Sequence, residues 1–166
     1  MKLKTDLPLL FDNLMNPERP YVPKGGETVK PTDASIGHIQ RHFGVKLPES
    51  LIEFALQSDH YDCWFAGLGD DYSSSNHIVR INSHYKKIRR RKGGAWAYTK
   101  PKDFILVHAD FDGRCLCLNA GKPSAMLGEY ELQYWFSGYE KEFGDKYSSF
   151  ECYIELLIAY LEEKAR

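Results

Sequence analysis

The 166-residue sequence has no apolar run long enough to cross a membrane or to serve as a signal peptide. Near the N-terminus the longest run covers only residues 9–11, and aspartate and proline bound it. A membrane helix needs about 20 apolar residues, and the apolar part of a signal peptide needs about 7–15. We therefore expect a cytoplasmic protein with no membrane partner.

Cysteine is scarce, and its spacing offers no familiar metal or redox motif. Of the four cysteines only Cys115 and Cys117 lie close together, and the C-x-x-C pair typical of zinc knuckles and thioredoxin-like sites does not occur. Cys115 and Cys117 alternate with leucines, so on a strand they would share one face. We interpret them as small core residues, the alternative being a metal or redox pair, and expect no cofactor and no metal.

Common catalytic signatures are also missing: the sequence contains no G-x-S-x-G, no P-loop and no G-x-G-x-x-G. His38 and His42 lie four residues apart on a predicted helix, but the glutamate of an H-E-x-x-H zinc site is absent. Asp110 and Asp112 straddle a predicted turn, where aspartate is common for conformational reasons. We therefore predict that the protein is not an enzyme and has no catalytic residues.

The chain divides into a proline-rich beginning and a patterned remainder. Residues 1–30 are predicted to be an extended N-terminal lead-in in which a single turn through 9–14 could dock Leu10 and Phe11, and residues 31–166 are predicted to form a single domain. Helical spacing of apolar residues predicts helices over 33–43, 48–58 and 149–163. The predicted helix caps are Asp33 for the first helix and a capping box of Ser148 and Glu151 for the last. A further helix is predicted from Ile78, although its start could also be a strand.

Between these helices, short apolar runs predict strands over 104–109, 114–119 and 129–136. Asp112-Gly113 marks a tight hairpin between the first two strands. Helices at both ends with strands between them predict an α+β fold, in which helices from both ends of the chain pack a central, largely antiparallel sheet.

Three segments resemble, in the same order, motifs of the SUKH superfamily of SMI/KNR-type domains. They are Ile36–Phe54, which reads I-x-x-I-x-x-x-F-G-V-K-L-P-E-S-L-I-E-F, the strand pair FILVHADFDGRCLCLN, and the ending SSFECYIELL. The resemblance covers residues 32–163 and implies a non-catalytic α+β binding domain. Bacterial members of this superfamily are mostly immunity proteins that bind a cognate polymorphic toxin, and fungal members regulate cell-wall synthesis.

The net charge of −1 conceals an acidic stretch and a basic cluster. Residues 48–85 carry six carboxylates and one basic side chain, and aromatic residues interleave with the carboxylates. Carboxylates attract a basic partner over long range, and Tyr and Trp are frequent at the energetic centres of interfaces. We expect Trp64 in this stretch to be a core residue. The residues predicted to bind the partner are Asp59, Tyr61, Asp62, Asp70, Asp71 and Tyr72.

The basic cluster is the alternative binding site. It consists of Lys86, Lys87, Arg89, Arg90, Arg91 and Lys92. Such a cluster could stabilise the end of a helix, or bind an acidic partner or a nucleic acid. The near-neutral chain and the lack of an RRM, KH or helix-turn-helix pattern argue against nucleic acid, although Trp96 and Tyr98 could stack on bases.

Together these observations predict a cytoplasmic immunity protein that binds a basic, nuclease-like protein toxin and neutralises it by stoichiometric occlusion. The alternatives are a regulatory scaffold of the SMI/KNR type, acting in cell-wall or envelope synthesis, and a nucleic-acid binder that uses the basic cluster.

Overall fold

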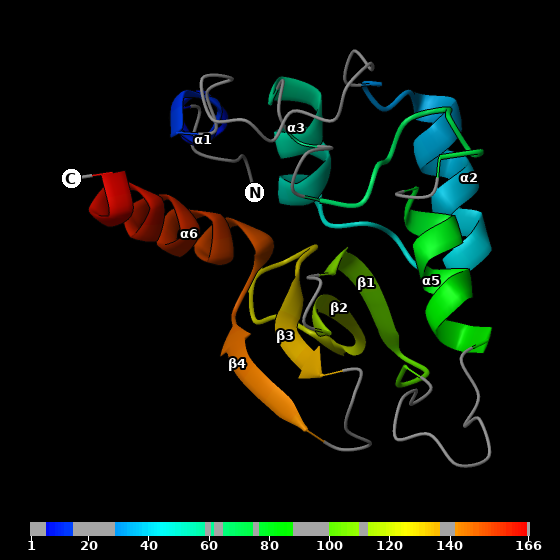
Figure 1. Cartoon of the computed structure of the whole chain (residues 1–166). Helices are drawn as coiled ribbons and strands as arrows, with labels where there is room; N and C mark the ends of the chain where they lie inside the picture. The colour runs from blue at the N-terminus through cyan, green and yellow to red at the C-terminus, as the bar shows by residue number, and fades with distance from the viewer. Residues whose placement is uncertain are drawn as a thin grey trace.

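The computed structural model describes residues 6–14, 29–58, 61, 65–74, 77–87, 100–109, 113–136 and 142–165, and only the backbone of Lys86, Lys87 and Ala165. In chain order the elements are α1 (Leu7–Leu14), α2 (Asp33–Phe43), α3 (Glu49–Gln57), α5 (Ile78–Lys87), β1 (Phe104–Ala109), β2 (Arg114–Pro123), β3 (Tyr130–Phe136), β4 (Phe143–Tyr147) and α6 (Phe150–Ala165) (Figure 1). The strands form one antiparallel sheet in the order β1-β2-β3-β4. The predicted α+β fold is confirmed.

The predicted helices all form, but two of the predicted caps are wrong by one residue. Thr32, and not Asp33, caps α2: its Oγ1 accepts a hydrogen bond from the backbone N–H of Ser35 at 3.1 Å. Ser149, and not Ser148, caps α6, because its Oγ accepts from the backbone N–H of Cys152 at 3.1 Å. Asp33 instead lies in the first turn of α2, where a carboxylate stabilises the helix dipole.

The lead-in predicted to be extended contains a two-turn helix, α1. Phe11 is fully buried and Leu7 nearly so, and α1 packs beside α6 and α3 at the upper left of Figure 1. The sequence predicted only a single turn here, because the prolines around it gave little support for a longer helix. The division of the chain at residue 31 stays a prediction.

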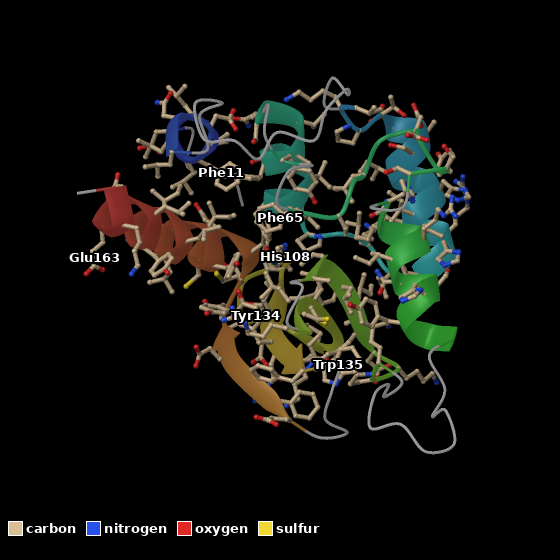
Figure 2. The ribbon with its side chains drawn as sticks, in the orientation of Figure 1. Phe11, Phe65, His108, Tyr134, Trp135 and Glu163 are labelled. Atoms are coloured by element: carbon tan, nitrogen blue, oxygen red, sulfur yellow. The ribbon has the colours of Figure 1, made fainter. Side chains whose placement is uncertain are left out.

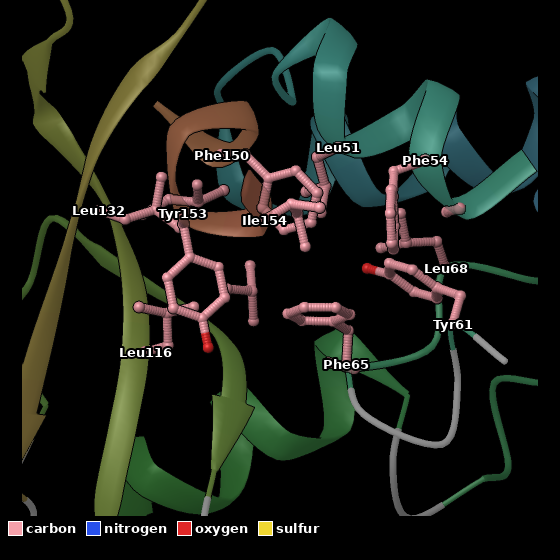
Figure 3. Packing of buried hydrophobic residues seen from close by; sticks show 14 of the residues in the cluster. Leu51, Phe54, Tyr61, Phe65, Leu68, Leu116, Leu132, Phe150, Tyr153 and Ile154 are labelled. Atoms are coloured by element: carbon pink, nitrogen blue, oxygen red, sulfur yellow. The ribbon is translucent and has the colours of Figure 1, made fainter. Parts of the chain in front are cut away.

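The sheet buries apolar side chains on both faces. One face supplies the main core, where Phe65 lies among rings and aliphatic side chains from α1, α3 and α6 (Figure 3). The other face carries Cys115, Cys117 and Trp135, against which Tyr85 of α5 packs. The prediction that the two cysteines share one buried strand face is confirmed. Burial raises the pKa of Cys117, so this thiol stays protonated and unreactive at neutral pH.

A buried amide joins α5 to the edge of this sheet. Asn82 Nδ2 donates to the carbonyls of Ile78 at 2.8 Å and Leu106 at 2.9 Å, and its Oδ1 accepts from the Leu106 N–H at 2.9 Å. On the next residue of β1, the carbonyl of Val107 accepts from the N–H of Ala66 at 2.7 Å. The edge of β1 is therefore hydrogen-bonded, which removes groups that could pair with another strand.

A buried carboxylate from the turn between β2 and β3 caps α3. The residue before this helix, Pro48, provides no side-chain cap. Glu129, which precedes β3, accepts from the Ser50 N–H at 3.2 Å and from the Ser50 Oγ at 2.8 Å. The negative charge also lies at the positive end of the helix dipole. The turn between β2 and β3 is thus fixed against the start of α3.

Candidate functional site

Tyr61, one of the predicted binding residues, is part of the aromatic core. Its side chain is only 1% exposed, and its ring stacks on Phe65 with the centroids 5.3 Å apart and lies 6.3 Å from Phe54 (Figure 3). The prediction that Tyr61 contacts a partner is therefore wrong. Alternating acidic and aromatic residues do not reveal which rings point inward, and here the apolar side of the segment packs into the core.

Several other predicted residues lie outside the described part of the chain. Asp59, Asp62 and Trp64 belong to this group, so their role stays a prediction. The role of the basic cluster also stays a prediction. The helix α5 ends at Lys87, and the described residues do not include Arg89, Arg90, Arg91 and Lys92.

Asp70, Asp71 and Tyr72 do come together on an exposed loop, residues 70–74, which precedes α5. Gly69 determines where this loop begins. A Cβ atom at Gly69 would lie 2.4 Å from the carbonyl oxygen of Val29, closer than real Cβ atoms approach. Only glycine lets the chain pass this close to the segment that leads into α2.

Hydrogen bonds hold both carboxylates of the loop. Thr32 Oγ1 donates to Asp70 at 3.2 Å and so ties the loop to the cap of α2. Asp71 Oδ1 accepts from the N–H of Ser73 at 3.1 Å and from its Oγ at 2.6 Å. This hydrogen bonding lowers the pKa of Asp71. Arg80 of α5 donates to the carbonyl of Ser73, so the loop is anchored at both ends.

The ring of Tyr72 contacts two histidines, one on α2 and one just before α5. Its centroid is 4.8 Å from that of His38 on α2 and 5.0 Å from that of His77, which precedes α5. The Tyr72 side chain is nevertheless 40% exposed. His38, Asp70, Asp71 and Tyr72 are from here on called the Tyr72 surface.

His77 is buried beneath this surface. Its Nδ1 accepts from the N–H of Val79 at 3.3 Å, which places the ring proton of the neutral form on Nε2. Burial lowers the pKa of His77, and the nearby backbone of Gly69 and the carboxylate of Asp71 only partly oppose that effect. His77 therefore acts as a neutral support for the Tyr72 ring.

The chemistry of this site suits binding. Tyr72 offers an exposed ring with a hydroxyl, while the carboxylates provide negative charge on a loop that is already ordered. Arg41, on the same helix as His38, contributes positive charge near Tyr72, so the surface is mixed and not uniformly acidic. A rigid, mixed surface of this kind loses little conformational entropy when a partner binds.

His38 and His42, whose spacing allowed a metal pair, each contact an aromatic ring. The ring of His38 contacts Tyr72, and the ring of His42 contacts Phe43. Among the residues that the structure describes, no three His, Cys, Asp or Glu side chains form a group that could hold a metal ion. Within the same ranges, no helix combines the length and the apolarity needed to cross a bilayer.

Sequence reasoning missed the contribution of His38, His77 and Thr32 to this site. Thr32 caps α2, His38 lies on α2, and His77 precedes α5. Thr32 and Asp70 are 38 residues apart in the chain. No local spacing rule links them, and only the packing of α2 beside α5 brings them together (Figure 1).

Comparison with solved structures finds a protein of similar fold. A crystal structure of a protein from Pseudomonas syringae pv. tomato superposes with a TM-score of 0.53 at 11% sequence identity, and the match covers 89% of this chain and 94% of that chain. Comparison with curated proteins finds no match. Residues 30–156 match the SMI1 / KNR4 family (SUKH-1). The match covers most of the sequence and includes all three motifs noted above except Leu157, the last residue of the third motif. The chain belongs to the SMI1/KNR4 family, the SUKH-1 branch of the superfamily.

Proposed function

We propose that this protein is a cytoplasmic, non-catalytic immunity protein that binds a cognate toxin and neutralises it by covering the toxin's substrate-binding surface. Membership of the SMI1/KNR4 family supports a role in binding. The observation that carries the proposal is the Tyr72 surface, an exposed tyrosine and two carboxylates on a loop anchored to α2 and α5. A nuclease is the expected toxin, because nucleases expose basic grooves for their substrates.

Occlusion of such a groove requires a stable interface. Specific protein complexes bury about 1,600 Å² in total, far more than one loop provides. We therefore place the Tyr72 surface at the centre of the interface, with the neighbouring outward side of α2 around it. Asp59 and Asp62, which precede the loop in sequence, are proposed to add to its negative field.

The first experiment measures binding to any toxin domain that a neighbouring gene is found to encode. Asp70→Asn combined with Asp71→Asn keeps the oxygen acceptors that order the loop and removes both charges. We expect slower association, with an effect that shrinks as salt screens the charges. Tyr72→Ala is expected to speed dissociation by about tenfold, since about 1.4 kcal/mol of contact energy corresponds to that factor.

A matched control separates local from overall charge. Glu142→Gln with Asp145→Asn changes the net charge equally, at exposed positions on and before β4. This control should bind like the original protein. If only changes in the cluster Lys86–Lys92 weaken the complex, the partner is acidic and the Tyr72 surface is ordinary solvated surface. If the protein does not protect cells from that toxin, the regulatory scaffold becomes the better interpretation.

A further inference from the structure

The helix α6 is apolar on nearly all sides over its first three turns. From Phe150 to Leu161 only Glu151 and Glu155 are charged. The side that carries Phe150, Ile154 and Leu157 packs into the main core. A helix that is apolar all round is normally covered all round.

The opposite side of α6 is open. Leu156 is 54% exposed and Tyr160 is 55% exposed, and one helical turn separates them, so their side chains are neighbours. Ala159 is exposed between them, and Cys152, one turn before Leu156, is partly exposed. We call Cys152, Leu156, Ala159 and Tyr160 the outer face of α6. Single exposed apolar residues are ordinary, whereas a continuous row of them marks an interaction surface.

The surroundings of this face are acidic. Glu155, Glu162 and Glu163 flank it on α6, and Glu163 lies at the outer end of the helix (Figure 2). The one basic side chain of α6, Lys164, lies over the Tyr160 ring, with its Nζ 5.6 Å from the ring centroid. The neighbouring helix α1, together with the residue before it, adds two aspartates and no basic residue.

This charge determines the occupant. An anionic lipid surface would repel the face, because membrane-bound helices carry Lys and Arg beside their apolar side. In a symmetric dimer through α6 the glutamates of both copies would meet, and like charges oppose that contact. We propose that the outer face of α6 binds a partner protein segment that presents apolar side chains flanked by Lys or Arg.

This surface is separate from the Tyr72 surface. Figure 1 shows α6 extending to the side of the molecule away from α2 and α5, which hold the 70–74 loop. Both surfaces can therefore be occupied at once, and the inference does not depend on the toxin. A protein with two such faces can join two partners.

The probe is a fluorescently labelled amphipathic peptide of leucine and lysine, about four helical turns long, and the readout is anisotropy with the full chain. Leu156→Ala combined with Tyr160→Ala should weaken binding at least about tenfold. Glu162→Lys with Glu163→Lys should also weaken it, and should favour a matching peptide of leucine and glutamate. The comparison variant Leu127→Ala with Phe143→Ala removes one leucine and one aromatic side chain from exposed positions elsewhere, and should bind as the original does.

Circular dichroism confirms that each variant is folded before binding is compared. Equal loss of binding in the comparison variant would place the peptide elsewhere or show that its binding is unspecific, and would overturn the proposal. Unchanged binding after Leu156→Ala with Tyr160→Ala would do the same. Sedimentation of the protein alone provides a further test: a dimer that these two substitutions abolish would show that the occupant is a second copy.

Discussion

Replacing Asn82 by alanine tests whether a single amide fixes α5 to the sheet. The substitution removes three hydrogen bonds and leaves the N–H and the carbonyl of Leu106 without the amide they pair with. The side chain of Asn82 is only 3% exposed, so water cannot readily replace it. An unsatisfied buried polar group costs about 1–3 kcal/mol. Two such groups predict a loss of about 2–6 kcal/mol in the free energy of unfolding.

Urea unfolding followed by circular dichroism measures this loss, and hydrogen exchange at the Leu106 amide locates it. Ser83→Ala is the matched control: Ser83 is the next residue of α5, and its Oγ donates to the carbonyl of Val79 within the same helix. That variant should lose less than about 0.5 kcal/mol, since the bond joins nothing outside α5. A loss below about 1 kcal/mol for Asn82→Ala, or unchanged exchange at Leu106, would refute the reasoning.

Two further predictions concern Glu129 and His77. Glu129→Ala should lower the free energy of unfolding by about 1–3 kcal/mol, because α3 loses its cap. The control Glu131→Ala, on β3, should lower it much less. Equal losses of the two variants in urea unfolding would contradict this prediction. Because burial lowers the pKa of His77, the unfolded chain binds this proton more readily, so stability should be constant above about pH 6.5 and fall as the pH drops below it. His77→Gln should remove this dependence of stability on pH, whereas His84→Gln, at an exposed position, should leave it unchanged. If the dependence persists in His77→Gln, other groups cause it.

The elements with a strong local pattern could be predicted from sequence. The apolar residues of α6 recur at helical spacing, and Leu and Cys alternate along β2 at the period of a strand. Gly44 ends α2 with a φ of 70°, in the left-handed region that glycine adopts most easily. β4 could not be predicted, because its sequence FGDKY has a glycine and two charges, and its exposed side chains give no alternation. This strand forms because β3 offers it a free edge.

The candidate site was predicted only in part, and for a physical reason. Asp70 and Tyr72 lie on the surface as expected, because charge beside a glycine turn favours an exposed loop. Tyr61 was misassigned, since a tyrosine suits both a core and an interface. The direction in which a ring points depends on the packing of Phe54 and Phe65 around it, which no local rule contains.

The cap that Glu129 provides for α3 has a consequence for how the domain comes apart. The start of α3 is completed by a residue 79 positions later, and the end of α3 holds α1 through Ser58 Oγ and Asp12. Opening the β2–β3 turn therefore weakens α3 first and α1 next, so the N-terminal helices and the hairpin should unfold as one cooperative unit. During synthesis, α3 must wait for the hairpin to emerge before its first turn is secured. A partner that stabilises α6 would slow the opening of this whole unit through α1 and α3.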